Sequence, residues 1–254
     1  MVFDRRLKGS FNGIGSLYDS ARASYPEKLI NDILTIASIS DGKVLDVGCG
    51  TGKATILFAQ RNFQVLGVDI GEELIALARE NTSQFSNASY QVSSFEEANL
   101  KQQSFDLIVS AQAWHWLDPK VAYEKAHDLL KNNGHIALFW KIQEYDKLNF
   151  LQDLKKLYVK HCPRYHNPGA ILSSERDLFI SPLFCNFEKR EYFVDLSYDR
   201  EKYAQLVSSM SWVIALEGED RIKFHEELSN LLSKQDETFS IPNKYTLLIA
   251  KKKN

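Results

Sequence analysis

The segment Val44–Gly52, with the sequence VLDVGCGTG, constrains the fold of this chain more than any other segment. A short apolar run contains the acidic residue Asp46, and three glycines at alternate positions then lead into an apolar helical pattern over 53–59. Glycine lacks a Cβ atom, so the chain can turn sharply here and a ligand can approach the backbone. The start of the following helix offers unpaired N–H groups and partial positive charge to an anionic group. The segment therefore predicts a nucleotide-cofactor site at a strand-to-helix turn.

Strands alternate with helices from residue 43 to residue 141, which is typical of a parallel sheet covered on both faces. The expected strands are Lys43–Val47, Gln64–Asp69, Ser89–Ser93, Phe105–Ala111 and His135–Lys141. The expected helices between them are Thr51–Arg61, Glu72–Asn81 and Pro119–Lys131, which have apolar residues at helical spacing. The alternation predicts an α/β fold.

The pattern is less regular after residue 142. We expect an amphipathic helix over Tyr145–His161, a loop over Cys162–Ser174 and helical structure over Arg200–Ser233. Two further strands are expected at Phe184–Asp195, where apolar and polar residues alternate, and at Lys244–Lys251. No repeat or low-complexity linker divides the chain, so we expect a single domain over residues 1–254.

Composition restricts the class of protein and its partners. Of the 254 residues, 44% are hydrophobic and 25% are charged, as in ordinary globular proteins, and the net charge of −2 does not favour a nucleic-acid partner. Cys49, Cys162 and Cys185 have neither disulfide nor metal-ligand spacing, which favours a reduced compartment and no bound metal. No leader pattern or apolar run of bilayer length is present. We expect a cytoplasmic monomer or homodimer that binds no membrane.

The spacing of the glycines excludes two common cofactor motifs. A dinucleotide fingerprint, G-x-G-x-x-G/A, needs a small third residue, but Lys53 or Thr55 occupies that position here. A phosphate-binding loop, G-x-x-x-x-G-K-[S/T], fails because Val47 replaces its first glycine and Ala54 its last residue. A phosphate-bearing cofactor is therefore disfavoured, and a nicotinamide-dependent dehydrogenase becomes a minor alternative.

The run Asp46–Gly52 instead resembles motif I of the class I S-adenosylmethionine-dependent methyltransferases. This resemblance implies a Rossmann-like, doubly wound sheet of seven mostly parallel strands, with the last strand antiparallel and helical lid insertions. It also implies S-adenosyl-L-methionine as cofactor, with the glycine turn at its aminoacyl end. The implied contacts in this motif are Asp46, as a partner of the loop or of the ammonium group, and Gly48, Cys49, Gly50 and Gly52.

Further cofactor residues follow from the same resemblance at the ends of the next strands. Asp69 is expected to accept hydrogen bonds from the ribose hydroxyls, although it could instead cap the following helix. Ile70 and Ser94 are expected near adenine, and Ala111 at the end of the fourth strand. Phe95 is expected beside Ser94, with burial in the core as its alternative.

The segment Gln112–Trp116 resembles the Gln-x-x-His-Trp segment of type 11 small-molecule methyltransferases, which include relatives of the trans-aconitate enzymes. Ligands bind outside the carboxyl ends of the strands in such sheets, so this segment is expected to face the transferred methyl group. Gln112 and His115 are the candidate catalytic residues. His115 could serve as a general base, bind the aminoacyl end or only orient the loop. Trp114 and Trp116 could line the substrate site or pack against the next helix.

The N-terminal segment 18–26 resembles the Tyr-x-x-x-Arg-x-x-Tyr-Pro signature of the same subgroup. Tyr18 and Arg22 share a helical face and are predicted to contact the cofactor, with a surface ion pair as the alternative for Arg22. Tyr25 and Trp212 are predicted to contact substrate, although Trp212 could equally pack between helices.

The resemblance also suggests a division of the domain. Its predicted parts are N-terminal lid helices at 1–40, a cofactor-binding core at 41–141, helical substrate-cap insertions at 142–182 and 196–238, and closing strands at 183–195 and 239–254.

The predicted function is methyl transfer to O, N or C of a small molecule, with a carboxylate-containing acceptor as one candidate. Two alternatives remain besides the dehydrogenase. One is a protein that binds S-adenosylmethionine or S-adenosylhomocysteine with little or no turnover, in a regulatory or scaffold role. The other is a methyltransferase acting on a macromolecule, which the absence of a basic patch disfavours.

Overall fold

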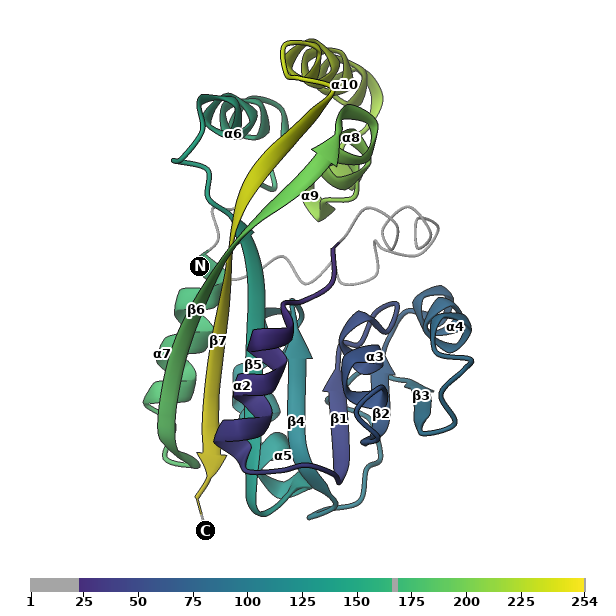
Figure 1. Cartoon of the computed structure of the whole chain (residues 1–254), viewed down its shortest axis with the longest axis vertical. Coiled ribbons are helices and arrows are strands. Elements are labelled where there is room, and N and C mark those ends of the chain that lie inside the picture. Colours follow the sequence, from purple (N-terminus) through teal and green to yellow (C-terminus); the bar gives the residue numbers. More distant parts are fainter. Residues whose placement is uncertain (1–22, 166–168, 254) are drawn as a thin grey trace.

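The computed structural model describes residues 23–165 and 169–253, and within them a seven-stranded sheet forms the centre of the molecule (Figure 1). The strand order is β3-β2-β1-β4-β5-β7-β6. The strands are β1 (Lys43–Val47), β2 (Gln64–Asp69), β3 (Ala88–Val92), β4 (Phe105–Ala111), β5 (Leu130–Gln143), β6 (Phe184–Asp199) and β7 (Thr238–Lys252). The last strand, β7, is antiparallel to both of its neighbours, whereas β3, β2, β1, β4 and β5 pair in parallel. The predicted Rossmann-like architecture is confirmed.

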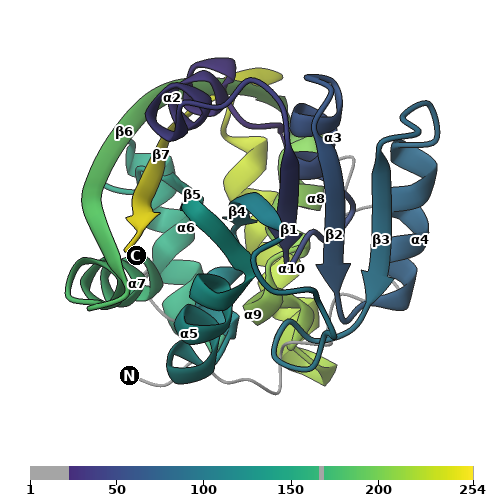
Figure 2. The same ribbon diagram turned by 90° about the horizontal axis from the view of Figure 1, so that it is seen from below.

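Helices cover both faces of the sheet, as Figure 2 shows. Helices α2 (Glu27–Ala37) and α3 (Lys53–Ala59) contribute to one apolar cluster, and α5 (Pro119–Leu129) and α7 (Gly169–Phe179) contribute to the cluster on the other face. Helix α4 (Glu72–Asn81) packs on β2 and β3. Because β1 lies between two covered faces, Val44 and Leu45 are both fully buried on opposite sides, which explains the continuous apolar pattern of this strand.

Helix α2 belongs to the layer over the sheet, which corrects the prediction of lid helices throughout 1–40. Leu29, Ile30 and Ile33 are fully buried against β5 and β7. These residues share one face of the helix, so burying that face stabilises its position on the sheet. Residues 1–22 of the predicted lid lie outside the described part of the chain.

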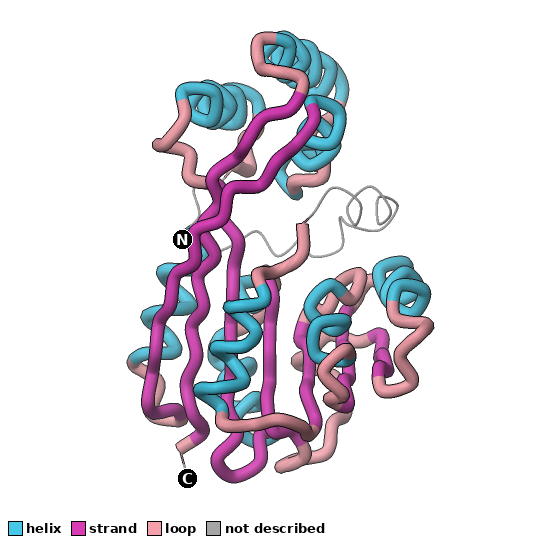
Figure 3. The backbone as a smooth tube through the Cα atoms, in the orientation of Figure 1, coloured by secondary structure: helices cyan, strands magenta, loops and turns pink. Residues whose placement is uncertain are grey.

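A helical cap lies above the sheet and is carried by the long strands β6 and β7 (Figures 1 and 3). The pairing of these two strands continues beyond the end of β5, from Asp195–Pro242 to Asp199–Thr238. The cap helices are α6 (Asn149–His161), α8 (Arg200–Ser208), α9 (Ser211–Ile214) and α10 (Gly218–Ser233). Together with the end of the two-stranded ribbon they enclose a separate aromatic cluster that includes Tyr158, Tyr203 and Phe224.

Three predicted boundaries are corrected by these elements. Strand β6 runs to Asp199, so the segment 196–199 belongs to the ribbon, because Leu196 and Tyr198 pack into the cap. The loop expected over Cys162–Ser174 is wrong from residue 169 onward, where α7 begins, and Leu178 anchors that helix in the core. Helix α5 ends at Leu129 rather than Lys131, because Leu130 already pairs with β4.

Candidate active site

The carboxyl ends of β1, β2 and β4 lie next to one another at the edge of the sheet that faces the cap (Figure 1). Strand β1 ends at Val47, β2 at Asp69 and β4 at Ala111, and all three strands are parallel. Ligands of open parallel α/β sheets bind outside this edge. The sheet therefore brings the glycine turn, Asp69 and the segment after β4 to one place.

The glycine turn after β1 depends on backbone conformations that favour glycine. Gly48, Gly50 and Gly52 have φ angles of 69°, 53° and 83°. Their surroundings differ, however. A Cβ atom on Gly48 would overlap the Cβ of Ala113, and one on Gly52 would lie 3.0 Å from the hydroxyl of Tyr90. On Gly50 it would meet no described atom within 4 Å. Of these three glycines, Gly50 is therefore the one at which the described residues leave room for a ligand.

The N–H groups of this turn are bonded within the protein. Those of Gly48 and Cys49 donate to the carbonyl of Val68, at 2.8 and 3.2 Å, and that of Gly52 donates to the Cys49 carbonyl at 2.9 Å. The N–H of Gly50 donates to the Asp69 carboxylate at 2.9 Å. A phosphate cradle needs such N–H groups to point at the ligand. The geometry therefore agrees with the exclusion of a phosphate loop.

Asp69, at the end of β2, is hydrogen-bonded to the turn that follows β1. One of its carboxylate oxygens accepts from Gly50, and the other accepts from the N–H of Gly71 at 2.9 Å. The N-cap of α4 is Gly71 and that helix has no side-chain capping bond, so the alternative that Asp69 caps the helix is wrong. The two bonds fix the carboxylate at the carboxyl edge beside the open Gly50.

Asp46 is fully buried behind the turn. The Thr55 hydroxyl donates to its Oδ2 at 2.7 Å, while its Oδ1 is buried without a hydrogen-bond partner among the described residues. Burial raises the pKa of Asp46 to about 7, with a further contribution from the charge of Asp69. The unpartnered oxygen of Asp46 is suited to a donor brought by a ligand.

Asp46→Asn is expected to become more stable relative to the unsubstituted protein as pH rises from 4 to 8. The folded pKa of Asp46 lies above its unfolded value, so the favourable contribution of the protonated form is lost as pH rises through about 7. Asparagine cannot ionise, and the difference in free energy of unfolding should change by up to about 1.4 kcal/mol per pH unit. Urea unfolding of both proteins across this pH range measures it. A difference independent of pH would contradict the assignment.

The remaining predicted cofactor residues lie around the same edge. Cys49 is buried, and burial raises the pKa of its thiol, so the thiol stays protonated at neutral pH. Ile70 and Ala111 are partly buried at the ends of β2 and β4. Their contacts with a cofactor stay predictions.

Ser94 and Phe95 make contacts within the protein. The Ser94 hydroxyl accepts from the N–H of Glu97 at 3.2 Å and donates to its carboxylate at 3.1 Å. Phe95 is 3% exposed, and its ring lies 5.8 Å from that of Trp114. Burial favours the core alternative for Phe95.

Gln112 holds the end of β4 to β5. It has a positive φ of 64°, its N–H donates to the Phe139 carbonyl at 2.9 Å, and its side-chain amide donates to the Lys141 carbonyl at 3.1 Å. These bonds give Gln112 an orienting function at the sheet edge. A direct role in catalysis stays a prediction.

His115 lies in the short helix η2 (Trp114–Trp116) and is bonded to β5. The indole N–H of Trp140 donates to its Nδ1 at 3.1 Å. Burial lowers the pKa of His115 to about 4, so its imidazole is neutral at pH 7. The sequence reasoning missed Trp140, because nothing in the local pattern of β5 indicates that its indole meets a residue 25 positions earlier.

The aromatic residues predicted to bind substrate lie in three different places. Trp114 is 3% exposed and packs between Phe95 and Tyr123, which favours the packing alternative. Trp116 is partly buried, with its ring 4.9 Å from that of His115. A contact of Trp116 with substrate stays a prediction.

Tyr25 and Trp212 both pack against other aromatic side chains. The Tyr25 ring packs edge-on against Phe139 at 4.8 Å, and Trp212 packs against Tyr158 and Tyr165 in the cap. Contacts of either residue with substrate stay predictions. Tyr18 and Arg22, predicted to contact the cofactor, lie outside the described residues.

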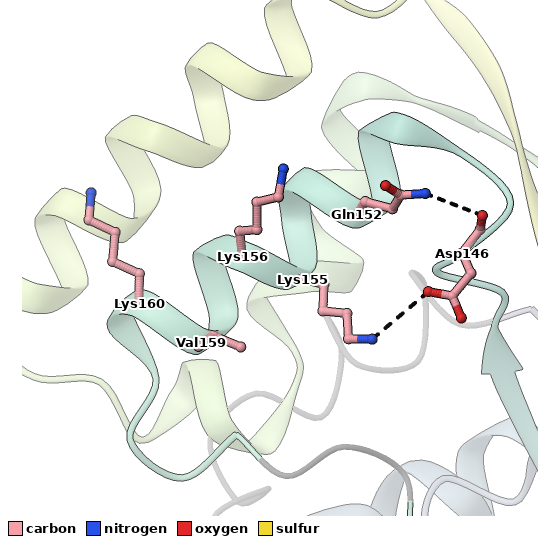
Figure 4. Close-up of a pocket in the computed structure, with 6 residues that line it drawn as sticks. All are labelled: Asp146, Gln152, Lys155, Lys156, Val159 and Lys160. Carbon is pink, nitrogen blue, oxygen red and sulfur yellow. Dashed lines mark hydrogen bonds and ion pairs between the residues drawn. The ribbon is translucent and has the colours of Figure 1, made fainter.

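A separate hollow of about 520 Å³ lies on the surface of α6 (Figure 4). Its lining residues are Asp146, Gln152, Lys155, Lys156, Val159 and Lys160. Each lysine has a carboxylate within 4.0 Å, in the pairs Lys155–Asp146, Lys156–Asp153 and Lys160–Glu227. Because these charges are compensated, the hollow offers no charged group specifically to a ligand.

Comparison with known proteins identifies the family. A family model described as a methyltransferase domain matches residues 39–175, which include the glycine turn, Asp69 and η2. The chain belongs to the methyltransferase-domain family. The predicted methyltransferase family is confirmed by this match, whereas the enzymatic activity and the cofactor S-adenosylmethionine stay predictions. The type 11 subgroup stays a prediction.

Individual relatives agree with this membership. An uncharacterized methyltransferase of Mycobacterium bovis is 31% identical over 153 residues, which are 60% of each chain. A Saccharomyces cerevisiae protein named as an S-adenosylmethionine-dependent methyltransferase is 28% identical over 65% of this chain and 57% of its own. The chain thus spans about 60% of the length of the first curated relatives it matches.

A solved structure shows the same fold. It belongs to a protein from Anaeromyxobacter dehalogenans named as a type II methyltransferase, and it superposes with a TM-score of 0.68. The match covers 91% of this chain and 97% of the other at 20% identity. Within the described residues, no helix is both long and apolar enough to span a bilayer.

Proposed function

We propose that the protein is an S-adenosylmethionine-dependent methyltransferase that acts on O, N or C of a small molecule. One observation carries the proposal: a glycine turn with internally bonded N–H groups has an unobstructed Gly50 bonded to Asp69, and a second carboxylate, Asp46, is buried in the strand that leads into this turn. Two acidic groups suit a ligand with an ammonium and a sulfonium charge and disfavour the pyrophosphate of a dinucleotide. The name of the yeast relative supports the same donor.

The residues at the sheet edge fit this cofactor. The buried and unpartnered Oδ1 of Asp46 is an acceptor for the ammonium group, and Asp69 lies where the ribose hydroxyls would bind beside Gly50. The sulfonium of the bound donor supplies an activated methyl group. The protein's contribution is then to orient the acceptor, which can account for roughly 7–11 kcal/mol of a barrier. Trp116 and the cap would form the walls on the acceptor side.

A carboxylate-containing acceptor is our candidate for the finer substrate class. A carboxylate is already ionised at neutral pH and needs no base to expose its lone pair. His115 is neutral and has its Nδ1 engaged, so the site is better suited to such an acceptor than to one that must first lose a proton.

Two experiments test the proposed function. Calorimetric titration with S-adenosylhomocysteine and, separately, with NADH should detect binding of the former alone. Transfer of labelled methyl from S-adenosylmethionine is then measured against a library of small carboxylic acids, amines and phenols. Binding of NADH alone would overturn the proposal. Tight binding of S-adenosylhomocysteine without transfer to any acceptor would favour the alternative of a binding protein without turnover.

Asp69→Ala is expected to weaken S-adenosylhomocysteine binding at least tenfold, or about 1.4 kcal/mol. The substitution removes the acceptor for the ribose hydroxyls and frees the N–H of Gly50. Calorimetry measures the change. Asp106→Ala is the matched control, because its carboxylate also accepts a backbone N–H, from Lys43 at 2.8 Å, but at the opposite end of the sheet. Unchanged affinity in Asp69→Ala would remove Asp69 from the ribose site.

A further inference from the structure

The hydrogen bond between Trp140 and His115 determines where the imidazole carries its proton. The indole Nε1 lies 3.1 Å from Nδ1 of His115. An indole N–H can donate but has no lone pair with which to accept. Nδ1 must therefore be the acceptor, and it carries no proton. Trp140 is only 2% exposed in the core, so its indole is held in this position by packing.

The protonation of the other ring nitrogen, Nε2, then follows by elimination. A neutral imidazole has one N–H group and one lone pair. The lone pair is at Nδ1 and is occupied by Trp140, so Nε2 carries the hydrogen. An Nε2–H group can donate a hydrogen bond but cannot remove a proton from a substrate. This arrangement is the opposite of what a general base at Nε2 requires.

We propose that Trp140 is a positioning residue that fixes His115 as the Nε2–H tautomer, so that His115 donates a hydrogen bond to an oxygen of the bound ligand and does not act as a general base. The assignment of the tautomer does not depend on any enzymatic activity of the protein. The ligand contact rests on the proposed methyltransferase function. The ligand chemistry is a carboxylate or carbonyl oxygen, which either the cofactor's aminoacyl end or the methyl acceptor can supply.

The tautomer is measured directly by two-bond ¹⁵N–¹H spectroscopy of the imidazole in the full-length, unsubstituted protein. The expected signature is a protonated Nε2 and an unprotonated, hydrogen-bonded Nδ1. In Trp140→Phe, which keeps an aromatic ring but lacks the donor, the signal of the second tautomer should appear. Trp116→Phe is the matched control, because it alters another ring beside His115 and should leave the tautomer unchanged.

A protonated Nδ1 in the unsubstituted protein would overturn the proposal, even if Trp140→Phe fails to fold. An Nε2–H signal equally dominant in folded Trp140→Phe would show that Trp140 does not fix the tautomer.

A pair of substitutions at His115 tests the donor role. The glutamine amide can donate near the position of Nε2 but cannot take up a proton, whereas alanine can do neither. His115→Ala should lower S-adenosylhomocysteine affinity if the oxygen belongs to the cofactor, or the rate of methyl transfer if it belongs to the acceptor. His115→Gln should recover at least tenfold of that loss, as expected for a hydrogen bond to a charged group.

The outcomes separate the two proposals. Equal losses in His115→Gln and His115→Ala would contradict the donor role, and so would the absence of any loss in His115→Ala. Absence of methyl transfer by the unsubstituted protein, together with an Nε2–H signal, would instead contradict the proposed function and leave the tautomer assignment intact.

Discussion

Gly48→Ala is expected to lower the free energy of unfolding by about 3 kcal/mol, a sum of backbone strain and overpacking. The φ angle of 69° is costly for any residue with a Cβ atom. The added Cβ would also overlap that of Ala113 in the segment after β4, so the two strand ends would have to separate. Urea unfolding measures the change.

Gly50→Ala provides the matched control for this prediction. Its φ of 53° imposes similar backbone strain, but the added Cβ meets no described atom within 4 Å. We therefore expect a loss of only about 1–2 kcal/mol of stability together with weaker binding of S-adenosylhomocysteine, because the methyl group enters the space left for the ligand. Equal stability losses in the two variants would contradict the distinction between a packing glycine and a ligand-facing glycine.

Trp114→Ala is expected to lower the free energy of unfolding by about 4 kcal/mol, as is typical when a buried tryptophan is truncated. The side chain is 3% exposed and packs between Phe95 and Tyr123, with ring centroids 5.8 and 5.3 Å away. Its removal would leave a cavity between β4, α5 and the loop after β3. Urea unfolding again measures the loss.

Trp116→Ala separates packing from substrate contact. Trp116 is only partly buried in the same short helix, so its truncation should cost less than half as much stability as that of Trp114. A stability loss below about 1 kcal/mol in Trp114→Ala, accompanied by altered acceptor kinetics, would instead place Trp114 in the substrate site.

Much of the fold could be predicted from local patterns. The alternation of apolar strands with amphipathic helices indicated the parallel sheet, and Asp118 caps α5 ahead of Pro119 as its sequence suggests. The length of β6 and the start of α7 could not be predicted in this way. The segment 196–199 is a strand because it pairs with β7, which lies about forty residues later, and its apolar side chains find partners only in the assembled cap.

The residues of the candidate site also differ in how well the sequence predicts their position. Asp69 could be located from sequence because it ends an apolar strand and precedes a helix, and the structure places it against Gly50. The sequence could not show whether Phe95 and Trp114 line a pocket or pack in the core, because an aromatic residue in a loop is compatible with both positions. Their burial depends on how η2, α5 and the loop after β3 pack together.

The sequence by itself determined the family and indicated where the candidate cofactor site lies, because the glycine turn and its spacing from Asp69 are local properties of consecutive strands. Only the tertiary structure decided which atoms are left for a ligand. It places Ala113 against Gly48 and the Trp140 indole against His115. Residues that are distant in the sequence make both contacts. The first contact closes Gly48 to a ligand, and the second puts the proton of His115 on Nε2.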